Sequence, residues 1–93
     1  MRNETALVTG ASDGIGLECC QILASHGYNL ILVARREAKL NELARDLNQS
    51  HGIQCTVIAA DLSLPQAAQR LFQNTKDQRL QVDFLINNAG LLH

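Results

Sequence analysis

A glycine-rich segment near the amino terminus constrains this 93-residue chain more than any other feature. The segment, Thr9-Gly10-Ala11-Ser12-Asp13-Gly14-Ile15-Gly16, stands between the apolar run Thr5-Ala6-Leu7-Val8 and a stretch with helical spacing of apolar residues. The apolar run predicts a buried parallel strand, and glycines allow a tight turn with close approach of the backbone to a ligand. Because the helix begins near Gly14, its unpaired N–H groups and positive dipole end face any anion held in the turn.

The spacing of this turn leaves two interpretations open. It reads G-x-x-x-G-x-G, whereas the common dinucleotide fingerprint reads G-x-G-x-x-G. One interpretation is a cradle for the pyrophosphate of a dinucleotide. The other is a strand-to-helix connection in which the glycines serve only the geometry of the chain.

Apolar runs and helical patterns alternate along the whole sequence. This alternation predicts an α/β fold in which crossover helices connect the strands of a parallel sheet. Right-handed crossovers give the strand order 3-2-1-4, and the ligand crevice is expected at the carboxyl ends of strands 1 and 4. We expect strands near 5–8, 29–33, 53–59 and 82–86, and helices near 14–25, 37–49 and from residue 63 onward.

Two helices carry more detailed expectations. The first is expected to bury one apolar face, made of Ile15, Cys19, Ile22 and Leu23. The third is expected to begin at Ser63, with Gln66 completing a capping box and Pro65 in the first turn, where no N–H partner is lost.

Two further motifs give the turn a family context. Asp61 ends the apolar run 55–60, and Asn87-Asn88-Ala89-Gly90 directly follows the run 82–86. In this order, T-G-x-x-x-G-I-G, the strand-ending Asp61 and N-N-A-G resemble the short-chain dehydrogenase/reductase family. The resemblance covers nearly the whole chain but only the front of that family's domain. It implies a partial Rossmann-like, doubly wound sheet, with residues 1–93 as the N-terminal part of one NAD(P)-binding domain and the catalytic C-terminal part absent.

The resemblance also implies roles for individual residues. Asp61 is expected to bind the adenine amino group, although a capping or turn aspartate is the alternative. Asn88 is expected to tie the fourth strand to the glycine turn through Thr9. The expected cofactor-binding residues are Gly10, Ser12, Asp13, Gly14, Ile15, Gly16, Arg35, Arg36, Asp61, Leu62, Asn88, Ala89 and Gly90.

The end of the second strand predicts which cofactor fits. NAD-binding proteins usually place Asp or Glu there to bind the ribose 2′-hydroxyl. Ala34 stands at that place, and Arg35 follows with a planar fork that suits a 2′-phosphate. This resembles members that prefer NADP(H) over NAD(H). Asp13 departs from the pattern, since many such relatives carry a basic residue there. Two solvated arginines at a helix start are the alternative interpretation of Arg35 and Arg36.

Two hypotheses about function follow. In the family, carbonyl reduction uses a Tyr, a Lys four residues later, a Ser and an Asn, all of which follow N-N-A-G. The chain has only Tyr28, at the wrong end of the sheet, so no catalytic residue is predicted. The first hypothesis is the dinucleotide-binding half of an oxidoreductase that transfers hydride between NADP(H) and a carbonyl or alcohol substrate. The second is a truncated, non-catalytic nucleotide-binding or association module.

Composition excludes other classes of partner. The net charge is −1 without a basic cluster, which argues against nucleic acid binding. No apolar stretch approaches the roughly 20 residues of a membrane span, and the first strand leaves no room for a targeting peptide. Cys19, Cys20 and Cys55 lack metal-site spacing and indicate reduced thiols, hence a cytoplasmic location. The resemblance implies that the parent protein is a homo-oligomer.

Overall fold

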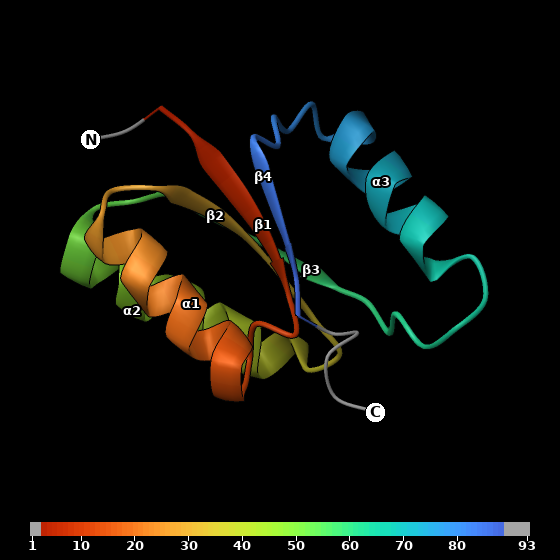
Figure 1. Cartoon of the computed structure of the whole chain (residues 1–93), viewed down its shortest axis with the longest axis horizontal. Helices are drawn as coiled ribbons and strands as arrows, with labels where there is room; N and C mark the ends of the chain where they lie inside the picture. The colour runs from red at the N-terminus through yellow and green to blue at the C-terminus, as the bar shows by residue number, and fades with distance from the viewer. Residues whose placement is uncertain (1–2, 89–93) are drawn as a thin grey trace.

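The computed structural model of the chain describes residues 3–88, in which strands and helices alternate strictly. The elements are β1 (Thr5–Thr9), α1 (Gly14–Ser25), β2 (Asn29–Ala34), α2 (Glu37–His51), β3 (Cys55–Ala59), α3 (Ala67–Asp77) and β4 (Phe84–Asn87). The strands pair in parallel in the order β3-β2-β1-β4. Helices α1 and α2 cover one face of the sheet, and α3 lies over the other (Figure 1). The predicted α/β fold and its strand order are confirmed.

The core lies on both faces of the central strands. In β2 the four residues 30–33 are almost completely buried, as expected for a strand covered on both sides. Alternate residues face opposite layers. Leu30 and Leu32 join the cluster beneath α1 and α2, whereas Ile31 and Val33 join the cluster beneath α3. The apolar run in the sequence therefore corresponds to a fully covered strand.

The predicted buried face of α1 is wrong in part. Ile15 and Ile22 are each 55% exposed, and only Leu23 of the expected apolar set packs on the core as a large side chain. The fully buried positions are instead the small residues Gly16, Cys20 and Ala24. Spaced four residues apart, they form one stripe along the helix. Because these side chains are small, the helix lies close to the sheet and to the glycine turn.

The start of α3 also differs from the prediction. The helix begins at Ala67, and its N-cap residue Gln66 has a φ of +64° and makes no side-chain capping bond. Ser63 is committed elsewhere, since its hydroxyl and amide both donate to Asp61 Oδ1, at 2.6 and 3.0 Å. This local turn competes with capping, and the N-cap at Gln66 lies three residues after the predicted cap at Ser63.

Strand β4 leaves an apolar edge. It pairs with β1 on one side, and within residues 3–88 no strand covers its other side. Leu85 is 51% exposed and Phe84 is also exposed. The Tyr28 ring packs edge-on against Phe84, with centroids 5.6 Å apart, which places this tyrosine at the amino end of the sheet. None of the helices within residues 3–88 combines the length and apolar character that crossing a lipid bilayer demands.

Candidate functional site

A groove of about 670 Å³ opens at the carboxyl ends of the strands. It lies where the strand order reverses between β1 and β4, the position at which open α/β sheets bind ligands. Its volume falls in the range of small-molecule sites. The predicted residues that line it are Gly10, Ser12, Asp13, Arg35, Arg36, Asp61, Leu62 and Asn88, joined by Val33, Ala34, Ala60, Ser63, Ala68 and Asn87.

The remaining predicted residues do not line this groove. Gly14 and Ile15 are exposed at the start of α1, and Gly16 is buried behind the turn. Gly14 has a φ of +54°, so it shapes the entry into the helix. Ala89 and Gly90 lie outside the described residues.

Two contacts fix the glycine turn, and one of them requires the absence of a side chain. Gly10 has a φ of +64°, and the amide of Ala11 donates to the carbonyl of Val33 at 3.1 Å, which ties the turn to β2. At Gly16, an added Cβ would lie 2.0 Å from the Gly10 carbonyl oxygen. The first turn of α1 is therefore pressed against the glycine turn, and this contact sets where the helix N-terminus lies.

The end of β4 is joined to the same turn. The Asn88 side-chain amide lies 3.4 Å from the Gly10 carbonyl oxygen, so the predicted tie between Asn88 and the turn runs through Gly10. The Thr9 hydroxyl lies 3.2 Å from Asn87 Oδ1 and 3.4 Å from the Ile86 carbonyl oxygen. Among residues 3–88, no donor reaches the buried Asn88 Oδ1. Asn87, which the list of predicted site residues omitted, thus helps to hold the turn.

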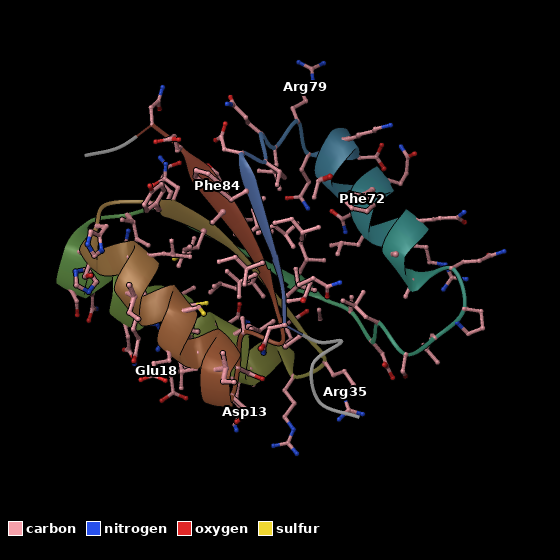
Figure 2. All side chains as sticks on the ribbon, viewed as in Figure 1. Asp13, Glu18, Arg35, Phe72, Arg79 and Phe84 are labelled. Carbon is pink, nitrogen blue, oxygen red and sulfur yellow. The ribbon has the colours of Figure 1, made fainter. Side chains whose placement is uncertain are left out.

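Arg35 and Arg36 carry the positive charge of the groove. Both are exposed and follow the half-buried Ala34, whose methyl group leaves open the place of an acidic side chain. Figure 2 shows Arg35 at the same end of the molecule as Asp13, with Phe84 at the opposite end. Two guanidinium groups beside a helix N-terminus favour a ligand that bears phosphate.

Asp61 follows β3, the strand that pairs with β2, and also lines the groove. The hydroxyl of Ser63, and next its amide, hold the pKa of the Asp61 carboxyl below its ordinary value, and the charge of Arg35 acts in the same direction. Both hydrogen bonds use Oδ1, and within the described part of the chain none reaches Oδ2. The turn interpretation of Asp61 therefore holds for one oxygen, while the other can accept a hydrogen bond from a ligand.

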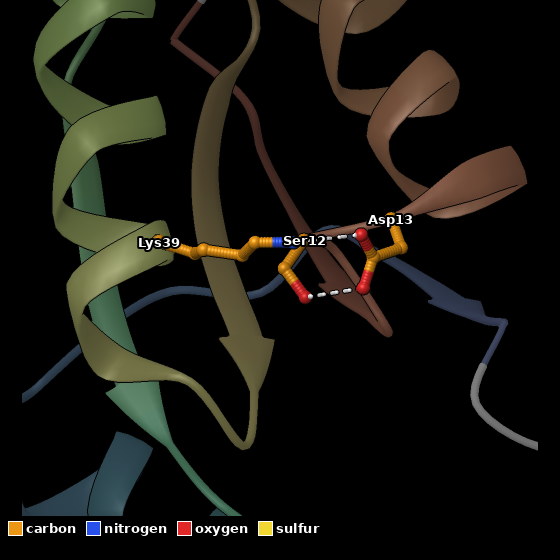
Figure 3. Close-up of polar contacts among 3 residues, drawn as sticks. All are labelled: Ser12, Asp13 and Lys39. Carbon is orange, nitrogen blue, oxygen red and sulfur yellow. Dashed lines mark hydrogen bonds and ion pairs between the residues drawn. The ribbon is translucent and has the colours of Figure 1, made fainter.

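Sequence reasoning missed Lys39, which belongs to the first turn of α2. Its Nζ lies 3.1 Å from Asp13 Oδ1, and the Ser12 hydroxyl lies 3.4 Å from Asp13 Oδ2 (Figure 3). The hydrogen bond and charge of Lys39 lower the pKa of Asp13, with a smaller effect from Arg36. The predicted strand order could have revealed this contact, since the glycine turn and the start of α2 follow neighbouring strands at the same end of the sheet.

Comparison with known proteins supports this geometry. Residues 4–93 match the family described as short chain dehydrogenase. The chain is 45% identical over 96 residues to the very-long-chain 3-oxoacyl-CoA reductase of Pyrenophora tritici-repentis, covering 99% of the chain and 28% of that protein. It is 40% identical over 73 residues to the 7beta-hydroxysteroid dehydrogenase of Collinsella aerofaciens, covering 78% of the chain and 28% of that protein.

A solved structure also resembles this chain in fold. L-sorbose reductase from Gluconobacter frateurii, complexed with NADPH and L-sorbose, superimposes with a TM-score of 0.85 and 31% identity, covering 95% of this chain and 34% of that one. The chain thus spans less than a third of the length of the two curated relatives described above. The motifs, the strand order and these matches agree, and the chain belongs to the short-chain dehydrogenase/reductase family.

Proposed function

We propose that residues 1–93 form the N-terminal part of a single NADP(H)-binding domain in an oxidoreductase that transfers hydride between NADP(H) and a carbonyl or alcohol. The observation that carries the choice of cofactor is the end of β2, where Ala34 replaces an acid and Arg35 and Arg36 flank the groove. A carboxylate at that place would bind a 2′-hydroxyl and repel a 2′-phosphate. Without it, the two guanidinium groups are suited to the phosphate.

Other residues in and around the groove would hold the remaining parts of the cofactor. The N-terminus of α1 and the turn from Gly10 to Gly16 would hold the pyrophosphate. Asp61 and Leu62 would hold the adenine, with Asp61 Oδ2 as acceptor for the amino group. Asn88, Ala89 and Gly90 would line the adjoining ribose and lead toward the nicotinamide.

In this proposal, the chain binds and orients the cofactor, and the nicotinamide supplies the hydride. Tyr28, the only tyrosine of the chain, lies at the far end of the sheet beside Phe84. The proton donor is therefore assigned to residues outside 3–88. The relatives named above are described as acting on a 3-oxoacyl-CoA, a hydroxysteroid and a sugar. This range supports a carbonyl or alcohol as the substrate class.

We also propose a cytoplasmic location and a homo-oligomeric parent protein. Support for the location comes from the free thiols of Cys19, Cys20 and Cys55. Burial raises the pKa of Cys20 to about 12 and that of Cys55 to about 11, which keeps both thiols protonated and slow to react. Support for assembly comes from the family resemblance.

The test is titration of NADPH and NADH into the complete natural polypeptide and its Arg35→Ala variant. A charge-assisted hydrogen bond contributes roughly 1.5–3 kcal/mol, so loss of the guanidinium is expected to weaken NADPH binding about tenfold or more. NADH affinity is expected to change little. Arg45→Ala, an exposed position on α2 away from the groove, is the matched control. Equal losses for both cofactors would contradict the assignment of Arg35 to the 2′-phosphate.

A further inference from the structure

The charges that line the groove balance one another. Two cations, Arg35 and Arg36, stand with two anions, Asp13 and Asp61. Each anion lies in the field of an arginine, since Arg36 contributes to the lowered pKa of Asp13 and Arg35 to that of Asp61. A phosphate monoester carries about −1.5 to −2 charges at neutral pH. The side chains that line the groove therefore carry no net charge.

Lys39 changes this balance of charge although it lies outside the groove lining. Its ammonium pairs with Asp13 Oδ1 at 3.1 Å. The pair bridges the glycine turn and the first turn of α2, as Figure 3 shows. With Asp13 neutralised, the two arginines outweigh the single remaining anion, Asp61. The contact thus converts a neutral groove into a positive one.

We propose that Lys39 is a positioning residue for cofactor choice, whose ion pair with Asp13 offsets the acidic side chain of the glycine turn, which would otherwise repel a 2′-phosphate. The inference rests on the proposed function, because it concerns the same groove and the same cofactor. It also accounts for an aspartate at a position where NADP(H)-preferring members of the family often carry a basic residue. Asp13 is tolerated there because α2 brings a lysine to it.

The size of the effect follows from exposure. The side chains of Asp13 and Lys39 are 72% and 46% exposed, so water and salt screen the pair. Exposed ion pairs contribute little, so we expect roughly a three- to fivefold change in affinity. Measurements at about 10 mM salt, where the Debye length is about 30 Å, give the largest signal.

The experiment is a double-mutant cycle on the complete natural polypeptide, with NADPH and NADH as the titrated probes. Lys39→Met is expected to weaken NADPH binding about three- to fivefold and NADH binding less than about twofold. Asp13→Asn alone is expected to tighten NADPH binding, because it removes an anion from the groove. The double variant is expected to return to within about twofold of the unsubstituted protein. Lys76→Met, in the last turn of α3, is the matched control.

Each outcome separates this inference from the proposed function. The inference alone is overturned if the unsubstituted protein binds NADPH and the Lys39→Met variant has the same ratio of NADPH to NADH affinity. A loss in Lys39→Met that Asp13→Asn does not reverse overturns the neutralisation mechanism. A loss that persists at about 1 M salt does the same, because exposed charges are screened within about 3 Å there. Absence of any dinucleotide binding refutes the proposed function and this inference together.

Discussion

A methyl group at Gly16 is expected to damage both the fold and the cofactor site. The Cβ of Gly16→Ala would lie 2.0 Å from the Gly10 carbonyl oxygen and 2.8 Å from both the Gly10 carbonyl carbon and Asn88 Nδ2. Two of these three atoms belong to the backbone of the glycine turn and cannot rotate away. Helix α1 must therefore retreat from the turn that it now contacts.

The magnitude comes from two opposing effects. Gly to Ala inside a helix normally stabilises by about 0.8–1 kcal/mol. Overpacking of a tightly filled site costs about 1–3 kcal/mol, and a backbone obstacle at 2.0 Å places Gly16 at the upper end. The net loss in the free energy of unfolding is therefore about 2 kcal/mol. NADPH affinity is expected to fall as well, because the retreat moves the N–H groups of α1 away from the groove. Gly16→Val is expected to abolish binding.

The assay is urea unfolding followed by circular dichroism, paired with NADPH titration, on the complete natural polypeptide. Gly52→Ala is the control, because Gly52 also lacks a side chain but an added Cβ meets nothing within 4 Å. Its φ of +70° makes alanine cost about 1–2 kcal/mol there, while NADPH affinity is expected to stay unchanged. A Gly16→Ala protein that is as stable as the unsubstituted one, or that binds NADPH equally well, would refute the close contact.

Three further predictions concern the end of β2, the β1–β4 pair and the exposed edge. Ala34→Asp is expected to shift the cofactor preference toward NADH by about tenfold in paired titrations, since a carboxylate repels the phosphate and accepts from the 2′-hydroxyl; an unchanged ratio would count against the NADP(H) assignment. Hydrogen bonds from the amide of Thr5, and then from Gln81, hold the pKa of the Asp83 carboxyl below its ordinary value. The carboxylate therefore stabilises the fold above about pH 4 and loses this effect as the pH falls through its lowered pKa. Urea unfolding of Asp83→Asn should therefore show less loss of stability between about pH 5 and pH 2, and an equal loss would contradict the assignment. The 93-residue chain alone is expected to aggregate through the apolar edge of β4 and to reduce no carbonyl; a monomer in sedimentation, or turnover above background, would contradict this.

The sequence predicted the elements best where burial is complete. The run 29–33 corresponds almost fully to β2, because a strand covered on both faces has apolar residues throughout. Strands β3 and β4 begin two residues later than predicted, at Cys55 and Phe84. Ile53 and Val82, which begin the two predicted runs, are apolar but lie before the first paired position. Apolar character alone does not define where pairing begins.

The prediction errors arose where distant or competing contacts determine the local structure. The start of α3 was misplaced because Ser63 can bond either to a following amide or back to Asp61, and the second alternative prevails. The buried face of α1 was misplaced because the contact between Gly16 and Gly10 rotates small residues toward the sheet. Lys39 was missed because it joins Asp13 across 26 residues, a separation that carries no periodic signal.

The order of the strands also has a consequence for how the chain is made. Strand β1 is synthesised early but lies between β2 and β4, and Thr9 meets Asn87 across 78 residues. At translation rates of about 5–20 residues per second, one edge of β1 waits roughly 4–16 seconds for its second partner. During that interval the half-built sheet presents an apolar strand to the cell. The glycine turn is likewise secured only when Asn87 and Asn88 arrive, so the cofactor site cannot be completed before residue 88 has been made.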